Sequence, residues 1–307
     1  MEKENRFPIF ACYAVLMVAL SAYVVLDTFV IQKTFAVVST NKTAQAAQAR
    51  ASAQGAVGQE TDAQGDQDAQ TGASTKVNLT THTYNGTTIY VADVYADSAT
   101  NLLAAFANDS YGRNVSATTS EIAASNGALL AINGDCYGMR NAGYVVRNGV
   151  LYRSESAGSD QEDLVIYADG TFRIIREGDV SAQELVDAGA WQVLSFGPGL
   201  VENGTVMVQP GEEVGRAKAS NPRTAIGKVS DGHYVFVVSD GRTDESEGLS
   251  LSDLATFMTT ELGVECAYNL DGGGSSTMVF EGSVVNKPTS SGNSIKEREV
   301  TDIVYIV

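Results

Sequence analysis

The sequence predicts an α+β (mixed α/β) fold with a single domain, in which a central mixed β-sheet is flanked by helices. One transmembrane helix and a disordered stalk are expected to precede this domain. Three observations lead to this expectation. An uninterrupted apolar run lies near the N-terminus, a segment poor in large apolar side chains follows it, and many short β-rich runs begin at about Val77.

The N-terminal element is expected to anchor the chain in a membrane. Residues 1–8 form a short tail, and the apolar run "IFACYAVLMVALSAYVVL" then opens a predicted signal anchor over residues 9–30. The run is long enough to span a bilayer, exceeds a typical signal-peptide core and has no cleavage motif directly after it. Charges on both sides leave the orientation undecided. The short tail and the large following domain favour a single-pass protein of the cell membrane with an extracellular C-terminal domain.

Residues 31–75 are predicted to form a low-complexity, flexible stalk. Ala, Gln, Gly, Thr, Ser and Asp dominate residues 39–75. Such a segment buries too little apolar surface to offset its conformational entropy. We therefore expect it to hold the domain off the membrane.

The domain itself is expected to occupy residues 76–307, with strands outnumbering helices. Period-two alternation and short apolar runs predict strands at 87–96, 127–134, 223–229, 233–241, 265–270, 277–282 and 300–307. Helical periodicity predicts helices at 100–109, 118–127, 181–189 and 250–263. Ser181 and Glu184 form a capping box at the start of the third helix.

Composition excludes several classes of function. A formal net charge of −17 argues against nucleic acid as a partner, because phosphate backbones favour clustered Lys and Arg. The two histidines, His82 and His233, complete no Cys/His metal pattern. The sequence requires no cofactor, although the acids described below could hold a divalent cation. Cys136 and Cys266 could form a disulfide or could be two buried free thiols.

Two polar segments at strand ends suggest a site. In "AINGDCYG", residues 131–138, Asn133 and Asp135 follow a buried strand and could project into a cleft, although Asn-Gly is also a common tight turn. In "NPRTAIGK", residues 221–228, Arg223 precedes a strand. Its planar guanidinium suits phosphate or carboxylate, and a surface ion pair is the simpler alternative.

Two further segments have the same character. In "FVVSDGRT", residues 236–243, Asp240 ends an apolar strand and Arg242 follows it, as in a turn or a catalytic strand end. The stretch "NLDGGGSS", residues 269–276, has neither the Walker sequence nor the GxGxxG spacing. Its three glycines lack Cβ atoms, so a ligand can approach the main-chain N–H groups beside the carboxylate of Asp271.

Together these motifs resemble the phosphodiester glycosidase family. The resemblance depends on the four segments above, on "SFGPGLVENG" and on the terminal "REVTDIVYIV", and it covers most of residues 85–307. The first motif departs from the family, which usually has Asn-Ala/Gly-Gly-Phe-Phe where this chain has "NGDCY". The resemblance implies hydrolysis of the glycosidic C–O bond of a sugar-1-phosphate diester, which yields a free sugar and a phosphomonoester.

With the resemblance, the residues give a candidate site. The candidate catalytic acids are Asp271, Asp240 and Asp135, and the candidate substrate-binding residues are Asn133, Arg223, Arg242, Gly272, Gly273, Gly274 and Ser275. The outward-facing location suggests a substrate among cell-envelope or exopolysaccharide glycans. Two alternatives remain open: a phosphodiesterase that cleaves P–O, and a non-catalytic glycan-binding module with Tyr137, Tyr144 and Trp191 as sugar platforms.

Overall fold

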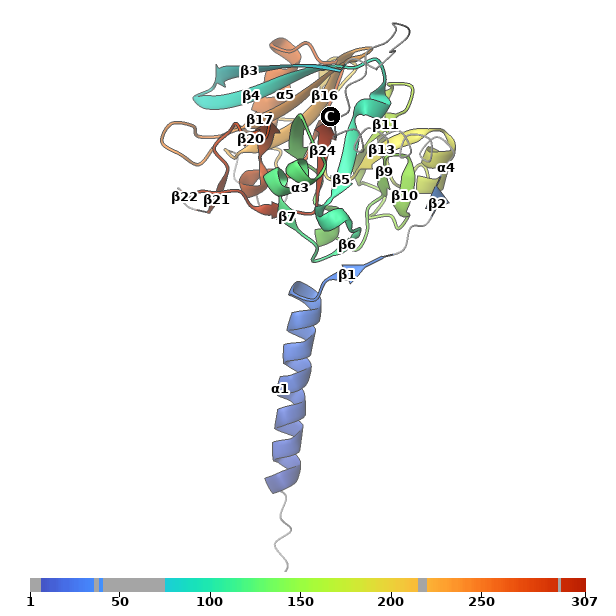
Figure 1. Cartoon of the computed structure of the whole chain (residues 1–307), viewed down its shortest axis with the longest axis vertical. Coiled ribbons are helices and arrows are strands. Elements are labelled where there is room, and N and C mark those ends of the chain that lie inside the picture. Colours follow the sequence, from blue (N-terminus) through green and yellow to red (C-terminus); the bar gives the residue numbers. More distant parts are fainter. Residues whose placement is uncertain (1–6, 36–38, 41–74, 215–219, 292–293) are drawn as a thin grey trace, which may run out of the picture.

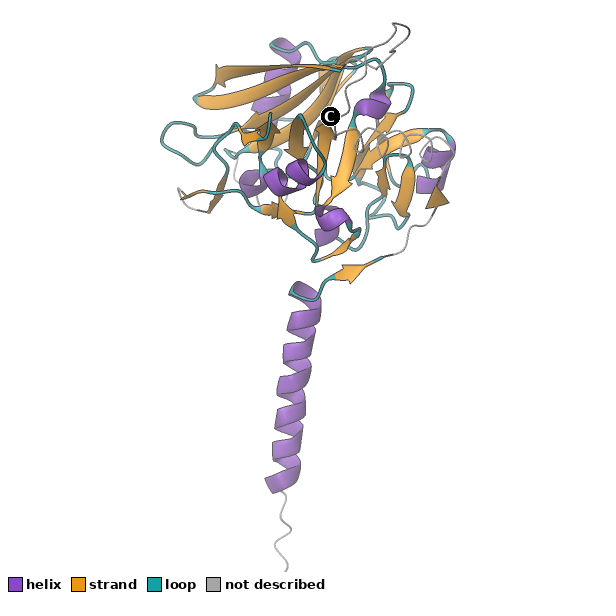
Figure 2. Cartoon of the chain, in the orientation of Figure 1, coloured by secondary structure: helices purple, strands orange, loops and turns teal. Residues whose placement is uncertain are grey.

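The computed structural model describes residues 7–35, 39–40, 75–214, 220–291 and 294–307. A long N-terminal helix, α1, projects from a domain made mostly of β-strands (Figures 1 and 2). Every strand pair in the described part of the chain is antiparallel, and the strands form three large sheets and three two-stranded pairs. The predicted single mixed sheet is therefore wrong in two respects: there are three large sheets, and their pairing is antiparallel.

The largest sheet has seven strands in the order β15-β14-β18-β16-β17-β4-β3. Its members are β3 (Lys76–Tyr84), β4 (Thr87–Tyr95), β14 (Gly199–Glu202), β15 (Thr205–Val206), β16 (Arg223–Ser230), β17 (His233–Ser239) and β18 (Cys266–Asn269). Helix α5 (Leu251–Thr260) packs its buried apolar side chains on one face of this sheet. The helix begins where Ser250 Oγ accepts a hydrogen bond from the backbone N–H of Asp253, at 2.9 Å.

A five-stranded sheet has the order β20-β19-β8-β24-β5. Its strands are β5 (Leu103–Phe106), β8 (Leu130–Asn133), β19 (Met278–Phe280), β20 (Ser283–Val284) and β24 (Asp302–Ile306). Helix α3 (Thr119–Ser125) packs against it. This sheet presents the end of β8, with Asn133, to the candidate site.

A six-stranded sheet has the order β12-β11-β13-β9-β10-β2. Its strands are β2 (Ser39–Thr40), β9 (Val145–Arg147), β10 (Val150–Arg153), β11 (Glu162–Tyr167), β12 (Phe172–Arg176) and β13 (Ala190–Leu194). Helix α4 (Ala182–Asp187) covers part of it and begins at the predicted Ser181–Glu184 capping box. The two-stranded pairs are β1 (Lys33–Thr34) with β6 (Gly112–Arg113), β7 (Ala117–Thr118) with β23 (Glu299–Val300), and β21 (Thr289–Ser291) with β22 (Ser294–Ile295).

The main hydrophobic cluster lies where the three large sheets meet. It combines side chains such as Ile132 of β8, Leu194 of β13 and Phe236 of β17, each of which is fully buried. Helices α3, α4 and α5 each cover an outer face of one sheet, so helices flank separate sheets instead of one central sheet.

The helix predicted at residues 100–109 is wrong. This segment contains strand β5 between two 3₁₀ turns, Ala99–Asn101 and Ala107–Asp109. Strand β5 pairs with β24 along four residues, and Ala104 and Ala105 are buried there. The helical propensity of Leu and Ala is small, and pairing with a buried strand outweighs it.

The N-terminal region begins with α1 (Phe7–Phe29), within which Ala11–Phe29 is long and apolar enough to cross a membrane. Residues 33–35 and 39–40 lie against the domain, although we expected them to belong to the stalk. Strand β1 pairs with β6, and β2 pairs with β10. The rest of the predicted stalk, 41–74, and the first six residues of the predicted tail lie outside the described residues.

Candidate functional site

The four polar segments predicted from the sequence meet at adjoining strand ends. Asn133 at the end of β8 donates from Nδ2 to the carbonyl oxygen of Asp271, at 2.6 Å. Its Oδ1 accepts a hydrogen bond from the Thr224 hydroxyl of β16, at 2.8 Å. The backbone N–H of Arg223 in turn donates to the hydroxyl of Ser239, the last residue of β17, at 2.9 Å. Segments that are up to 138 positions apart in the chain therefore form one continuous hydrogen-bonded unit.

Asn133 acts as a structural connection within this unit. Its side chain is fully buried, and both of its amide atoms are engaged with neighbouring segments. The substrate-binding role expected from the sequence would need a free amide atom. The geometry instead gives Asn133 the task of fixing the main chain at Asp271.

Asp271 is the candidate acid that solvent can reach, since it is partly exposed. Burial raises the pKa of its carboxyl, while hydrogen bonding with the Ser275 hydroxyl, the charge of Arg298 and a hydrogen bond with Cys136 act in the opposite direction. A carboxyl group whose pKa lies above the ordinary range and which is open to solvent is suited to proton transfer.

Asp135 differs from Asp271 because its side chain has no exposed surface. Its Oδ1 forms an ion pair with Arg147 at 2.7 Å, and its Oδ2 accepts the backbone N–H of Ser195 at 2.7 Å. Arg147 also binds Asp302 at 2.8 Å, so one buried guanidinium on β9 joins the segment after β8 to β24. Burial, and next the charge of Asp135, raise the pKa of Asp302 to about 7, and Arg147 opposes them.

Asp240 is also buried, with 2 % of its surface exposed. Its Oδ1 accepts the backbone N–H of Lys287 at 2.8 Å, and its Oδ2 accepts the hydroxyl of Tyr90 at 3.4 Å. Burial raises the pKa of the Asp240 carboxyl. Burial and then the charge of Asp240 raise the pKa of Tyr90 to about 12. These contacts suit a residue that orders the loop near Lys287.

Two arginines lie over the glycine loop. A Cβ atom built on Gly273 would lie 2.9 Å from Nη2 of Arg242, and one on Gly274 would lie 2.6 Å from Nη2 of Arg298. Both glycines thus allow a guanidinium to approach the backbone beside Asp271. Gly273 also has φ +62°, which favours glycine.

The arginines differ in how much they are covered. Arg242 and Arg298 are exposed, and each could reach a bound anion. Arg242 binds the side-chain oxygen of Asn221 at 2.8 Å, which holds its guanidinium over the loop. Arg223 is buried, and it donates to the Leu249 carbonyl and forms an ion pair with Glu213. Direct anion binding therefore fits Arg242 and Arg298 better than Arg223.

The loop also has polar atoms that lack partners in the described part of the chain. Ser275 and Ser276 are buried, and Gly272 and Gly273 are partly exposed. Oδ1 of Asn269 and the hydroxyl oxygens of Ser276 and Thr277 are buried without a hydrogen-bond partner among the described residues. Such orphaned polar atoms are uncommon in native proteins, and these three flank the glycine loop in the sequence, which favours a site that a ligand or water completes.

Sequence reasoning missed Arg147, Asp302 and Arg298. The first two were detectable as charged residues inside the apolar runs "YVVRNG" and "VTDIVYIV". A charge in a buried strand requires a partner, and each of these is the partner of the other. Arg298 lies in a polar segment, and its sequence gives no comparable signal.

The residues proposed for other roles are placed clearly. Tyr137, Tyr144 and Trp191 are each less than 5 % exposed, so they offer no exposed ring for a sugar. Cys136 and Cys266 are free thiols, and burial raises the pKa of both. Among the described residues, no group of three or more His, Cys, Asp or Glu side chains is arranged to hold a metal ion.

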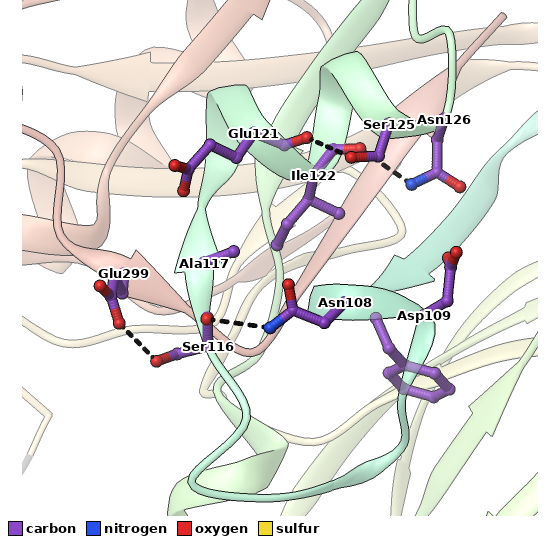
Figure 3. A pocket seen from close by; sticks show the side chains of 10 residues that line it. Asn108, Asp109, Ser116, Ala117, Glu121, Ile122, Ser125, Asn126 and Glu299 are labelled. Carbon is purple, nitrogen blue, oxygen red and sulfur yellow. Dashed lines mark hydrogen bonds between the residues drawn. The ribbon is translucent and has the colours of Figure 1, made fainter.

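A separate cavity of about 450 Å³ lies beside α3 (Figure 3). Two of its three carboxylates already have partners: Glu121 caps α3 through Thr118, and Glu299 accepts the Ser116 hydroxyl at 2.6 Å, while Asp109 is the third. This cavity contains none of the four motifs. We therefore assign the candidate site to the Asp271 loop, which combines an accessible acid, two arginines and a bared backbone.

The fold and this loop define an antiparallel β-domain with an acidic, arginine-covered site at converging strand ends. The profile of the family described as phosphodiester glycosidase matches residues 126–307, which is more than half of the chain. The chain therefore belongs to the phosphodiester glycosidase family, which confirms the resemblance seen in the sequence.

Named relatives agree with this assignment. The N-acetylglucosamine-1-phosphodiester alpha-N-acetylglucosaminidase of Mus musculus is 32 % identical over 190 residues, which cover 56 % of this chain and 36 % of the relative. The SPbeta prophage-derived uncharacterized protein YomE of Bacillus subtilis is 32 % identical over 185 residues, which cover 58 % of this chain and 28 % of the relative. The matches thus span about a third of the length of these curated relatives.

A solved structure has the same fold. The zebrafish N-acetylglucosamine-1-phosphodiester alpha-N-acetylglucosaminidase catalytic domain, auto-inhibited by its pro-peptide, aligns with a TM-score of 0.59 and 19 % identity. The alignment covers 90 % of this chain and 87 % of that one. A hypothetical protein from Synechocystis aligns with a TM-score of 0.54 at 15 % identity, over 76 % of this chain and 62 % of that one.

Proposed function

We propose that this protein is a membrane-anchored hydrolase that cleaves the glycosidic C–O bond of sugar-1-phosphate diesters. The observation that supports this most directly is the partly exposed carboxyl of Asp271 beside Arg298 and the glycine backbone. Relatives named for N-acetylglucosamine-1-phosphodiesters make that sugar the first substrate to test.

The chemistry follows from the leaving group. A phosphomonoester is a weak base, so its departure needs fixed positive charge more than a strong general acid. Arg242 and Arg298 supply this charge over Gly273 and Gly274. Each guanidinium can bind phosphate oxygens as a fork.

Asp271 then acts at the anomeric carbon. In the simplest version its carboxylate takes a proton from water, the water oxygen bonds to the anomeric carbon, and the carbon–oxygen bond to phosphate breaks. The electron pair of the broken bond remains on the phosphate oxygen. Asp135, Asp240, Asn133 and Arg223 are assigned positioning roles, because their side chains are buried and engaged with other parts of the protein.

The anchor and location are part of the proposal. Helix α1 would cross the cell membrane and leave the domain outside, where cell-envelope or exopolysaccharide glycans are the candidate substrates. Protease treatment of intact cells should digest the domain. Full protection of the domain in intact cells, with digestion after lysis, would contradict the outward orientation.

The activity is tested with the full chain in detergent and a methyl diester of N-acetylglucosamine-1-phosphate. Asp271→Asn should lower kcat by about 10²-fold or more, the usual effect of removing a general base, and the exposed Asp244→Asn control should not change it. Hydrolysis in oxygen-18 water should place the label in the sugar. Label in the phosphate would instead establish the P–O-cleaving alternative, and equal activity of Asp271→Asn and the native protein would contradict the assigned role.

A further inference from the structure

The end of the predicted anchor is attached directly to the domain. Strand β1 pairs Lys33 with Arg113 and Thr34 with Gly112 of β6, and Phe35 N–H donates to the Tyr111 carbonyl at 3.0 Å. The side chain of Asn114 donates to the carbonyls of Thr28 and Ile31, at 3.3 and 3.0 Å. These contacts join the last turn of α1 to the loop that carries β6 (Figure 1). If α1 spans the membrane as proposed, this face of the domain lies at the membrane surface.

A pocket of about 300 Å³ opens on the same face, and we call it the anchor-side pocket. Its walls come from Phe35, from the β6 region with Tyr111 and Arg113, from the turn at residues 137–141, and from Tyr152 and Arg153 of β10. The aromatic rings pack together. The ring centroids of Phe35 and Tyr111 are 5.7 Å apart, and those of Tyr111 and Tyr152 are 5.0 Å apart. Phe35 is half exposed, and the apolar side chains of Phe29, Val30 and Ile31, shortly before it in the chain, are exposed as well.

The charge of this pocket is opposite to that of the protein as a whole. Arg113, Arg140 and Arg153 line it, and one acid, Glu155, lies among its lining residues. No carboxylate forms an ion pair with any of the three arginines in the described part of the chain. Arg153 is 8 % exposed, and among the described residues its guanidinium donates only to the carbonyls of Gly143, Tyr137 and Arg140. A buried cation bonded only to carbonyls retains its full charge, so it favours an anion beside it.

The anchor-side pocket and the candidate active site share a wall. The 3₁₀ turn Tyr137–Met139 lines the pocket, and just before this turn the carbonyl oxygen of Gly134 accepts the backbone N–H of Asp271 at 3.3 Å. Arg140, which follows this turn, also lines the pocket, and its Nη1 donates to the carbonyl oxygen of Ser195 at 3.2 Å. A diester that reacts at Asp271 could therefore extend its aglycone past this turn towards the membrane.

We infer that the anchor-side pocket binds the anionic, lipid-bearing aglycone of a sugar-1-phosphate diester held in the membrane. This inference depends on the proposed function, and it specifies the substrate class as lipid-linked. Aromatic rings and Phe35 accept the start of the hydrocarbon chain, and the arginines accept negative charge carried by the aglycone near the headgroup. The glycine loop holds the sugar-1-phosphate itself.

The test uses the full chain in phosphatidylcholine nanodiscs with two substrates that share the same sugar-1-phosphate. One has as its aglycone a long-chain lipid alcohol that carries a further anionic group and is embedded in the bilayer, and the other has a soluble methyl aglycone. Arg113→Gln should lower kcat/KM about fivefold for the lipid-linked substrate, the effect of about 1 kcal/mol for one basic residue near anionic lipid, and should leave the methyl diester unchanged. Arg173→Gln, an exposed arginine on β12, is the matched control and should change neither.

The outcomes separate the inference from the function on which it depends. An equal loss on both substrates, or no loss on either, would overturn the lipid-binding role while leaving the hydrolase intact. Absence of turnover with both substrates in the native protein would refute the proposed function instead. In that case a binding measurement still tests the lipid-binding role of the pocket. Dihexanoyl phosphatidic acid should raise the Tm of the nanodisc-embedded protein, and Arg113→Gln should reduce this rise in Tm. An equal rise in Tm with inorganic phosphate, or no rise with the phosphatidic acid, would contradict a lipid as the ligand of the pocket.

Discussion

Asp163 on β11 gives a sharp prediction about stability and pH. Its side chain is fully buried, and its Oδ2 receives no hydrogen bond from the described residues. Burial, and then the neighbouring charge of Glu177, raise the pKa of its carboxyl to about 9. The folded protein therefore keeps a proton on Asp163 at neutral pH, whereas the unfolded chain, with a pKa of about 3.9, loses it.

The size of the effect follows from this difference of one proton. The contribution of Asp163 to the free energy of unfolding is complete below about pH 4. It decreases by about 1.4 kcal/mol per pH unit as the pH rises towards 9. Between pH 6 and 8 this amounts to about 2.7 kcal/mol. For a domain of this size, Tm should fall by about 3–5 °C per pH unit from this group.

The substitution Asp163→Asn isolates the contribution. An amide is neutral and nearly isosteric with the protonated carboxyl, so we expect the variant to lack this loss of stability on raising the pH. Urea unfolding of the full chain in detergent at pH 6, 7 and 8 would measure the difference. Asp160→Asn, at an exposed position, is the control and should follow the native protein. Parallel stability curves for Asp163→Asn and the native protein would refute the reasoning.

Three further predictions concern the site and its support. Gly273→Ala should lower the free energy of unfolding in urea by about 1 kcal/mol, because the residue has φ +62°, and should lower kcat/KM, because its new Cβ would displace the guanidinium of Arg242. Unchanged kinetics would contradict the assigned anion site. In the pH profile of kcat/KM, the acid limb should have its midpoint above the usual Asp pKa, since burial raises the pKa of Asp271 and a general base must be ionised. A rate that does not depend on pH would exclude Asp271 as the general base. Arg147→Met should destabilise the fold by about 3–5 kcal/mol, because it leaves the buried carboxylates of Asp135 and Asp302 unpaired; a loss below 1 kcal/mol would show that they are neutral.

Local patterns predicted many of the elements. The helix over Leu251–Thr260 and the hairpin of β16 and β17 follow directly from periodicity and capping. The prediction of a helix at residues 100–109 failed because β5 is stabilised by β24, which lies almost 200 residues later in the chain. Local propensity contains no information on such a partner.

The candidate site could be predicted in part. The chain places acids and arginines at strand ends, and the structure brings these ends together through Asn133. Sequence could not distinguish Asp271 from Asp135 and Asp240, because the difference between them is burial. Asp135, just after β8, contacts Arg147 of β9 in another sheet, and nothing near either residue in the sequence indicates that contact.

The position of β24 has a consequence for how the protein matures. This strand follows every other described strand in the chain, yet it lies between β5 and β8 and carries the Asp302 partner of Arg147. Until residues 302–306 emerge from the ribosome, β8 lacks a neighbour on one side and Arg147 lacks one of its two carboxylates. Such long-range pairing is slow to form. Strand β8 therefore cannot gain its second neighbour during synthesis of the preceding residues, and the domain remains incompletely folded until β24 is made.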